Sequence, residues 1–163
     1  MEIDDNTRRL EQIVNAFRAR AFIQRDLSAI DELLTPDFVD HFAPPWDPPG
    51  REGVRRRFGQ AAMGFHTTRV EVVLSVSRGN VLMQAIRIHM KHTGDFMGIA
   101  PTDREFSIGG FDAFEVRGDK LAAHWGVYDV SRIPDLLGMT PGPEAPSPTS
   151  WMAMWEATAG ART

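Results

Sequence analysis

The stretch FSIGGFDAFEVRGDKLAAHWGVY, residues 106–128, decides the fold. Apolar residues alternate with others on both sides of Arg117-Gly118-Asp119, and a period of two is typical of β-strands. The central glycine supplies the positive backbone angle that a tight hairpin turn requires. We therefore predict two antiparallel strands over 106–116 and 121–128.

The same signals continue toward the N-terminus. Segments 70–77 and 81–91 alternate around a second turn, Arg78-Gly79-Asn80, and predict another strand pair. Helices are predicted over 27–34 and 53–65, with a strand over 38–42 and a proline-rich loop over 43–50 between them. Ahead of these, a long amphipathic helix capped by residues 4–7 is predicted by apolar residues at spacings of three and four: Leu10, Ile13, Val14, Phe17 and Ala21.

Helices followed by an antiparallel sheet define an α+β fold. We expect a cone-shaped curved antiparallel sheet wrapped around the long N-terminal helix, an α+β barrel with an apolar interior. This domain is expected over residues 1–139. Residues 140–148 read as a stiff Pro-rich linker, and Ser150 can cap a short C-terminal helix in which Trp151 and Trp155 share one face. We expect that helix to dock on the barrel or on a partner subunit.

Composition narrows the classes of function. The chain has 163 residues, 42% of them hydrophobic and 25% charged, which suits one globular domain with a substantial core. A formal net charge of −4 without a basic stretch argues against nucleic acid as a partner. No apolar run is long enough to span a membrane and no signal peptide is evident, so we expect a cytoplasmic protein. The absence of cysteine excludes disulfides and thiolate chemistry.

The residues that suggest chemistry lie on the last two predicted strands. Alternation places Asp112 on one face of its strand, and His124, Gly126 and Tyr128 on one face of the next. A carboxylate and an imidazole are the pair needed to remove a proton beside a carbonyl and return one to oxygen. The alternative is that Asp112 is a hydrogen-bonded structural residue and His124 a core histidine. We do not expect a metal site, because His89 and His92 fall on opposite faces of one strand.

Further substrate contacts are predicted with an alternative role for each. His41 can point into the cavity mouth or cap the proline loop, and Tyr128 can donate to a developing oxyanion or simply pack. Trp125 has the opposite alternation to His124, which favours packing beneath the sheet. Asp129 can touch substrate or cap a short helix.

Three other positions bear on the shape of the pocket. Phe96 and Met97 are candidates for apolar lining, with burial in the core as the alternative. Gly126 removes a side chain where a ligand ring would otherwise meet one. We therefore expect room for a bulkier or differently oriented substrate near Gly126.

Several short motifs together resemble a known family. They are His92-Thr93-Gly94-x-Phe96-x-Gly98-x-x-Pro101-Thr102, then Gly118-Asp119-Lys120, His124-Trp125-x-x-x-Asp129 and Leu136-Leu137-Gly138. Their order and spacing, over roughly residues 8 to 139, are similar to those of the SnoaL-like polyketide cyclases of the nuclear transport factor 2-like superfamily.

The resemblance implies a cone-shaped α+β barrel, usually a homodimer, without metal or organic cofactor. It also implies acid-base aldol cyclisation of aromatic polyketide intermediates in antibiotic biosynthesis and other secondary metabolism. The best-known cyclases of the family carry their acid-base aspartate at the position of Gly126, and a histidine at the position of Asp112. Here the acid group lies across the pocket, or the reaction differs.

Three functions follow from these observations. The first is a cofactor-independent cyclase or isomerase, of lyase or isomerase type, in which Asp112 and His124 transfer protons on a polyketide-like intermediate and the pocket holds the reacting atoms together. The second is a hydroxylase-like or oxygenase-partner role. The third is a small-molecule-binding module without catalysis.

Overall fold

The computed structural model describes residues 4–138. The chain divides into two compact units, residues 1–128 and residues 129–163. The first unit holds all five strands of the described chain. The predicted Pro-rich linker and the helix with Trp151 and Trp155 lie outside the described residues.

The N-terminal helix is α1 (Asp5–Phe17), and it begins as predicted at a capping carboxylate. The backbone N–H of Thr7 donates to Asp4 Oδ1 at 2.8 Å, which satisfies one of the donors at the helix start. Beyond Phe17 the helix widens into the π-helix η1 (Arg18–Ile23). Short π-helical turns inside helices occur frequently at functional sites. Two further helices follow, α2 (Ser28–Leu33) and α3 (Gly50–Gly64).

The sheet has the strand order β1-β5-β4-β3-β2. Its strands are β1 (Leu34–Asp40), β2 (Phe65–Arg78), β3 (Val81–His92), β4 (Glu105–Arg117) and β5 (Lys120–Tyr128). Strands β2 to β5 form an antiparallel meander, and the predicted hairpin glycines have positive φ, 60° at Gly79 and 62° at Gly118. Both predicted hairpins are confirmed.

Two strand starts differ from the prediction. Strand β1 begins at Leu34 rather than at 38 and runs parallel to β5, whereas the other pairs are antiparallel. It includes Pro36, which is tolerated because β1 is an edge strand and one side of it needs no ladder hydrogen bonds. Strand β2 begins at Phe65, five residues earlier than predicted, with Phe65 and Thr67 buried.

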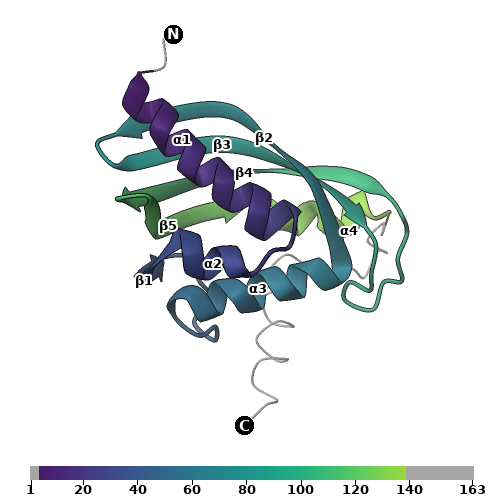
Figure 1. Cartoon of the computed structure of the whole chain (residues 1–163). Helices are drawn as coiled ribbons and strands as arrows, with labels where there is room; N and C mark the ends of the chain where they lie inside the picture. Colours follow the sequence, from purple (N-terminus) through teal and green to yellow (C-terminus); the bar gives the residue numbers. More distant parts are fainter. Residues whose placement is uncertain (1–3, 139–163) are drawn as a thin grey trace. The chain divides into compact units, whose positions relative to one another are not determined.

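The curved sheet wraps around α1, which lies across one of its faces (Figure 1). We call the face toward α1 the inner face and the opposite one the outer face. The hydrophobic core lies between the helices and the inner face. It joins α1, α2, β1 and the inner face through fully buried side chains, including Leu10, Val14, Ile30, Leu82 and Leu121. This confirms the predicted α+β class with a curved sheet around the N-terminal helix.

The second unit begins at Asp129. Its described part holds the 3-10 helix η2 (Val130–Arg132) and the helix α4 (Ile133–Leu136). The hydroxyl of Ser131 donates to Asp129 Oδ1 at 3.1 Å. Asp129 stands at the start of this short helical turn, but its side chain makes no capping hydrogen bond to the backbone there, so neither of its two predicted roles is confirmed.

Candidate acid-base site

The register of the sheet brings the predicted residues together on the inner face. Asp112 pairs with Gly126, Gly110 with Tyr128, and Phe114 with His124. Cross-strand partners share a face of the sheet. The predicted alternation is therefore confirmed for Asp112, His124 and Tyr128, which project from neighbouring strands toward the helices.

Asp112 forms a buried ion pair with Arg18, the first residue of the π-helix η1. Arg18 Nη2 donates to Asp112 Oδ1 at 2.7 Å, and both side chains are less than a tenth exposed. Arg18 Nη1 donates to Gln84 Oε1 at 2.7 Å, and Gln84 Nε2 donates to the hydroxyl of Ser75 at 2.9 Å. Buried charges are stable only when paired and hydrogen-bonded, and this pair is both.

Tyr128 links Asp112 to His124. Its Oη lies 3.3 Å from Asp112 Oδ2, to which it donates, and 3.4 Å from His124 Nε2. Burial of the phenol, reinforced by the negative charge of Asp112, raises the pKa of Tyr128 well above its usual range. The hydroxyl therefore keeps its proton at neutral pH and acts as a hydrogen-bond donor.

His124 is held on its other side by Asp40, at the end of β1. Its Nδ1 lies 3.1 Å from Asp40 Oδ1, and Arg57 of α3 donates to Asp40 Oδ2. Burial acts to raise the pKa of the Asp40 carboxyl, but the hydrogen bond from His124 and the charges of His124 and Arg57 outweigh it, so the pKa is lowered. Asp40 is therefore a carboxylate at neutral pH.

This arrangement defines what His124 can do. An imidazole nitrogen that faces a carboxylate carries the proton, so Nδ1 donates to Asp40 and Nε2 is left as an acceptor. A second proton on Nε2 would give an imidazolium that Asp40 stabilises. His124 is thus oriented to accept a proton through Nε2 and to return it.

Sequence reasoning missed four members of this network, Arg18, Gln84, Asp40 and Arg57. Arg18 lies four residues after Val14, on the apolar stripe of the helix, and Gln84 lies between Leu82 and Ile86 in the inward alternation of β3. A polar residue at a position that its apolar neighbours place in the core was the signal available for both.

Two predicted contacts lie on the outer face. The rings of His41 and Trp125 stack at a centroid distance of 4.4 Å and an interplanar angle of 4°. Trp125 pairs with Ala113 and so points away from His124, as its alternation predicted. The structure brings His41 and Trp125 together with each other, but on the side of β5 opposite to His124.

Phe96 and Met97 belong to the connection between β3 and β4. Phe96 packs on Phe65 with ring centroids 4.7 Å apart, whereas Met97 is half exposed with φ of 54°. His92 anchors this connection, since its fully buried ring accepts at Nδ1 from the backbone N–H of Thr102 at 3.2 Å. The motif that starts at His92 therefore shapes a loop and contributes no group to the His124 network.

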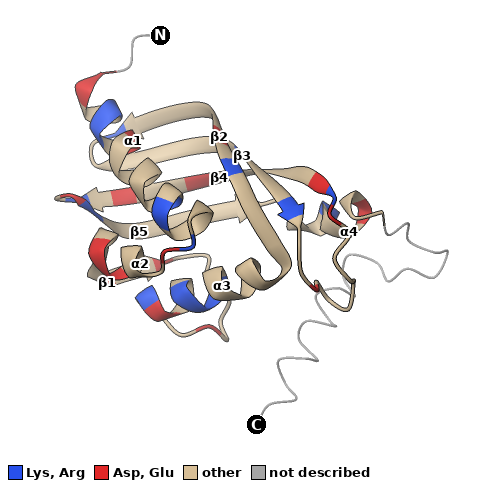
Figure 2. Cartoon of the chain, turned by 45° about the vertical axis from the view of Figure 1, so that its right-hand side comes forward, with Lys and Arg blue, Asp and Glu red and all other residues tan. Residues whose placement is uncertain are grey.

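The arginines near the start of α3 are paired with carboxylates. Arg55 donates to Asp31 at 2.8 Å, and Arg57 donates to Asp47 at 2.7 Å as well as to Asp40. Figure 2 shows these basic positions on α3. They form ion pairs rather than an open anion site, and through Arg57 they connect α3 to His124.

An apolar cavity of about 260 Å³ lies between η1, α3 and the start of β2. The π-helix thus carries Arg18 to the polar network and Ala21 and Phe22 to this cavity. Phe58 also lines the cavity, and its ring stands 5.8 Å from that of Phe17, which in turn meets Phe114 at 6.3 Å. A row of aromatic rings therefore connects the cavity to Phe114, the neighbour of His124.

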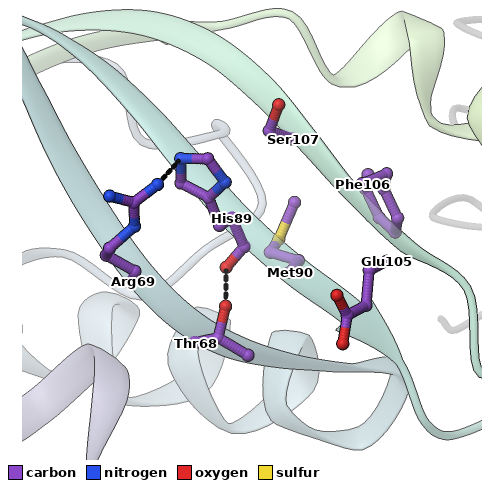
Figure 3. A pocket seen from close by; sticks show the side chains of 7 residues that line it. All are labelled: Thr68, Arg69, His89, Met90, Glu105, Phe106 and Ser107. Atoms are coloured by element: carbon purple, nitrogen blue, oxygen red, sulfur yellow. Dashed lines mark hydrogen bonds between the residues drawn. The ribbon is translucent and has the colours of Figure 1, made fainter.

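A second hollow, of about 300 Å³, is polar and lies near the ends of β2, β3 and β4 (Figure 3). There the side chain of Arg69 contacts His89 Nε2 at 3.0 Å, and Thr68 donates to the carbonyl of His89 at 3.2 Å. Glu71 meets the same Nε2 at 3.0 Å, so the imidazole is held within a charged cluster. The His124 network is not part of this hollow.

Within residues 4–138, no group of three or more His, Asp or Glu side chains could hold a metal ion. In the same part of the chain, no helix is both long and apolar enough to cross a membrane.

Comparisons with known proteins identify the family and the fold. The family model of SnoaL-like polyketide cyclases matches residues 12–134, and the chain belongs to this family. Among curated proteins, none matches in sequence.

Solved structures share the fold over most of the chain. TsrD from Streptomyces laurentii superposes with a TM-score of 0.69 at 24% identity, covering 85% of this chain and 100% of its own. IdmH from Streptomyces antibioticus, a proposed polyketide cyclase, gives 0.65 at 26% identity, covering 79% and 98%. AclR from Streptomyces galilaeus, a proposed hydroxylase, gives 0.66 at 21% identity, covering 83% and 99%.

Proposed function

We propose that the chain is a cofactor-independent cyclase or isomerase acting on a polyketide-like natural-product intermediate. His124 and Asp112 belong to its proton-transfer network, in which the hydroxyl of Tyr128 links them. Membership of the SnoaL-like family supports the substrate class, and the inner-face network supports proton transfer.

One observation carries the proposal. A single phenol oxygen stands 3.3 Å from Asp112 Oδ2 and 3.4 Å from His124 Nε2, and each of these groups is fixed from behind, by Arg18 and by Asp40. Groups that transfer protons must be held within hydrogen-bond reach of one another and of the substrate. A buried histidine needs partners on both ring nitrogens in any case, so the proposal rests on which partners these are: a carboxylate on Nδ1 leaves Nε2 as a proton acceptor beside the phenol.

The apolar cavity supports a ring-shaped substrate. Its lining is mostly aliphatic and aromatic, with Arg25 and Thr67 as polar members, and its volume of about 260 Å³ lies just below the usual range for ligand pockets. A cavity of that size takes one or two fused rings. Binding of the rings there would hold the rest of an intermediate in place, which is a large part of what a cyclase must do.

The test uses 2-tetralone, a bicyclic aromatic ketone with acidic hydrogens beside its carbonyl. We expect the protein to accelerate the exchange of these hydrogens for deuterium in D₂O. Proton NMR measures the rate of this exchange. His124→Gln removes the proton acceptor and should lower the catalysed rate by about 100-fold or more. His66→Gln, an exposed histidine at the start of β2, is the matched control and should leave the rate unchanged.

The outcomes separate the three candidate functions. Binding of 2-tetralone without any catalysed exchange, in the wild type as in His124→Gln, would favour a binding module. A conversion of polyketide substrates that stops when oxygen is removed would favour the hydroxylase-like role. Exchange that depends on His124 and is indifferent to oxygen supports the acid-base enzyme.

We also propose that two copies associate through the outer face. Two cross-strand rows there are largely apolar, Leu74-Ala85-Phe111-Val127 and Val76-Met83-Ala113-Trp125. Five of these side chains are roughly half exposed: Leu74, Val76, Met83, Phe111 and Val127. A contiguous apolar sheet face of this kind marks an interaction surface. A homodimer covers it, and light scattering should give a mass of twice 18.2 kDa.

A further inference from the structure

Two glycines create the space that Tyr128 occupies. A Cβ atom at Gly110, its partner on β4, would lie 2.4 Å from Tyr128 Cδ1. A Cβ atom at Gly126 would lie 2.9 Å from Tyr128 Oη and 2.7 Å from His124 Nε2. Heavy atoms do not approach so closely without displacement. Both strands therefore lack a side chain where this phenol lies. The expectation that Gly126 leaves room for a bulkier substrate was wrong, because the side chains of His124 and Tyr128 fill that space.

The hydrogen bonds of the site place one donated proton, that of the Tyr128 hydroxyl, between Asp112 and His124. Asp112, as a carboxylate, only accepts: Arg18 donates to its Oδ1, and Tyr128 Oη faces its Oδ2. His124 Nε2 is an acceptor as long as Nδ1 donates to Asp40. The phenolic O–H is thus the donor that lies between two acceptors.

We propose that Tyr128 is the proton donor of the site, and that Asp112 orients its hydroxyl. This assignment rests on the proposed function, because it names the acid that acts opposite the base His124. A substrate oxygen that gains negative charge near Oη would receive the phenolic proton.

The proton balance closes within the network. His124 Nε2 takes a proton from the carbon beside the substrate carbonyl, and the electron pair of that C–H bond forms the new bond or the enolate. The oxygen that becomes negative takes the proton of Tyr128. The imidazolium then returns its Nε2 proton to the tyrosinate oxygen, 3.4 Å away, which restores both groups. No oxidant or reductant is consumed.

The strength of the acid matches this task. Burial raises the pKa of Tyr128, so the hydroxyl is never lost at neutral pH and is always available to donate. An alkoxide formed by carbon–carbon bond formation is a stronger base than a phenolate, so it takes the proton, whereas an enolate oxygen is stabilised by the hydrogen bond that Oη donates. Asp112 stabilises the imidazolium that forms nearby, while Asp40 stabilises it from the other side.

Tyr128→Phe is the direct test, since it removes the hydroxyl and keeps the ring between the two glycines. With 2-tetralone in D₂O, the exchange rate at saturation should fall by about 100- to 1,000-fold, as when an oxyanion donor is lost. The dissociation constant of 2-tetralone should change by less than about threefold, because the donor acts on the developing charge. Circular dichroism confirms that the variant folds.

Two further variants keep the assignment falsifiable. Asp112→Asn retains an oxygen that accepts from Tyr128, so it should lose only about tenfold in rate. Gly126→Ala places its Cβ atom against both Oη and His124 Nε2 and should lower the rate at least as much as Tyr128→Phe. A rate in Tyr128→Phe equal to that of the wild type, or a larger loss in a folded Asp112→Asn, overturns Tyr128 as the donor.

The same assay separates this inference from the proposed function. Dependence on His124 with indifference to Tyr128 leaves the enzyme in place and removes only the tyrosine. Absence of exchange in the wild type, with 2-tetralone bound, overturns both.

Discussion

The two faces of strands β4 and β5 reverse the usual distribution of polarity, in which apolar side chains are buried and polar ones are exposed. The inner face, packed under α1, carries buried polar and charged groups at its centre, with Asp112 paired to Arg18 and His124 hydrogen-bonded to Asp40. The outer face carries exposed apolar residues such as Phe111 and Val127. Polar groups can be buried when they are hydrogen-bonded to one another, and an exposed apolar patch marks a surface that a partner covers.

The largest expected effect comes from breaking the inner pair. Arg18→Met leaves Asp112 buried without its partner, and we expect the free energy of unfolding to fall by about 3–5 kcal/mol. Urea denaturation measures it. The double variant Arg18→Met with Asp112→Leu should recover most of the loss, because it removes both charges.

A pair at the end of the same strand provides the control. Arg117, the last residue of β4, meets Asp37 at 2.8 Å, but both side chains are more than half exposed. Arg117→Met should leave the urea midpoint unchanged within error, because water screens such pairs. An equal loss for both arginines would mean that burial does not set the value of these ion pairs.

The next largest effect concerns the outer face. Phe111→Asp should raise the dimer dissociation constant by about 100-fold, since a buried aromatic is worth roughly 2–3 kcal/mol. Sedimentation or light scattering over a dilution series measures the change. Gln12→Asp, an exposed residue of α1, is the control. An unchanged dissociation constant in Phe111→Asp would show that the two copies associate through another surface.

Gly109 and Gly110 are consecutive residues of β4 and lie on opposite faces of the sheet, so the same substitution can be compared on both faces. Gly110→Ala places a Cβ atom 2.4 Å from the ring of Tyr128, whereas a Cβ atom at Gly109 meets nothing within 4 Å. We expect Gly110→Ala to lower the free energy of unfolding by about 1–3 kcal/mol, as for overpacking in a core. Gly109→Ala should be neutral or slightly stabilising. Equal effects would contradict the placement of Tyr128.

The sequence predicts which face of the sheet a residue occupies far better than it predicts the side chains that the residue contacts on that face. Alternation placed Asp112, His124 and Tyr128 together, because two strands joined by a two-residue turn have a nearly fixed register. The partners that define their chemistry come from distant segments: Arg18 lies 94 positions from Asp112, and Asp40 lies 84 positions from His124.

The helices and the edge strand explain why those partners were missed. Strand β1 carries Asp40 to His124 through a parallel pairing with β5, and no local signal specifies a parallel partner. The π-helix keeps the composition of an ordinary amphipathic helix, so the turn that aims Arg18 inward is invisible in a pattern of apolar spacings. Long-range packing, rather than local preference, assembles this site.

The smallest expected effect is electrostatic and concerns the inner face alone. The folded-state pKa of Asp40 lies below its ordinary value, so the folded protein binds fewer protons there than the unfolded chain. Its contribution to stability is complete above the unfolded pKa of about 3.9 and is lost as the pH falls through the lower folded value. Asp40→Asn lacks this contribution at neutral pH and has nothing to lose on acidification. Urea midpoints of wild type and Asp40→Asn should therefore approach each other as the pH falls from about 5 to below about 3.9. A constant difference across this range would mean that Asp40 acts on His124 by shape and hydrogen bonding rather than by its charge.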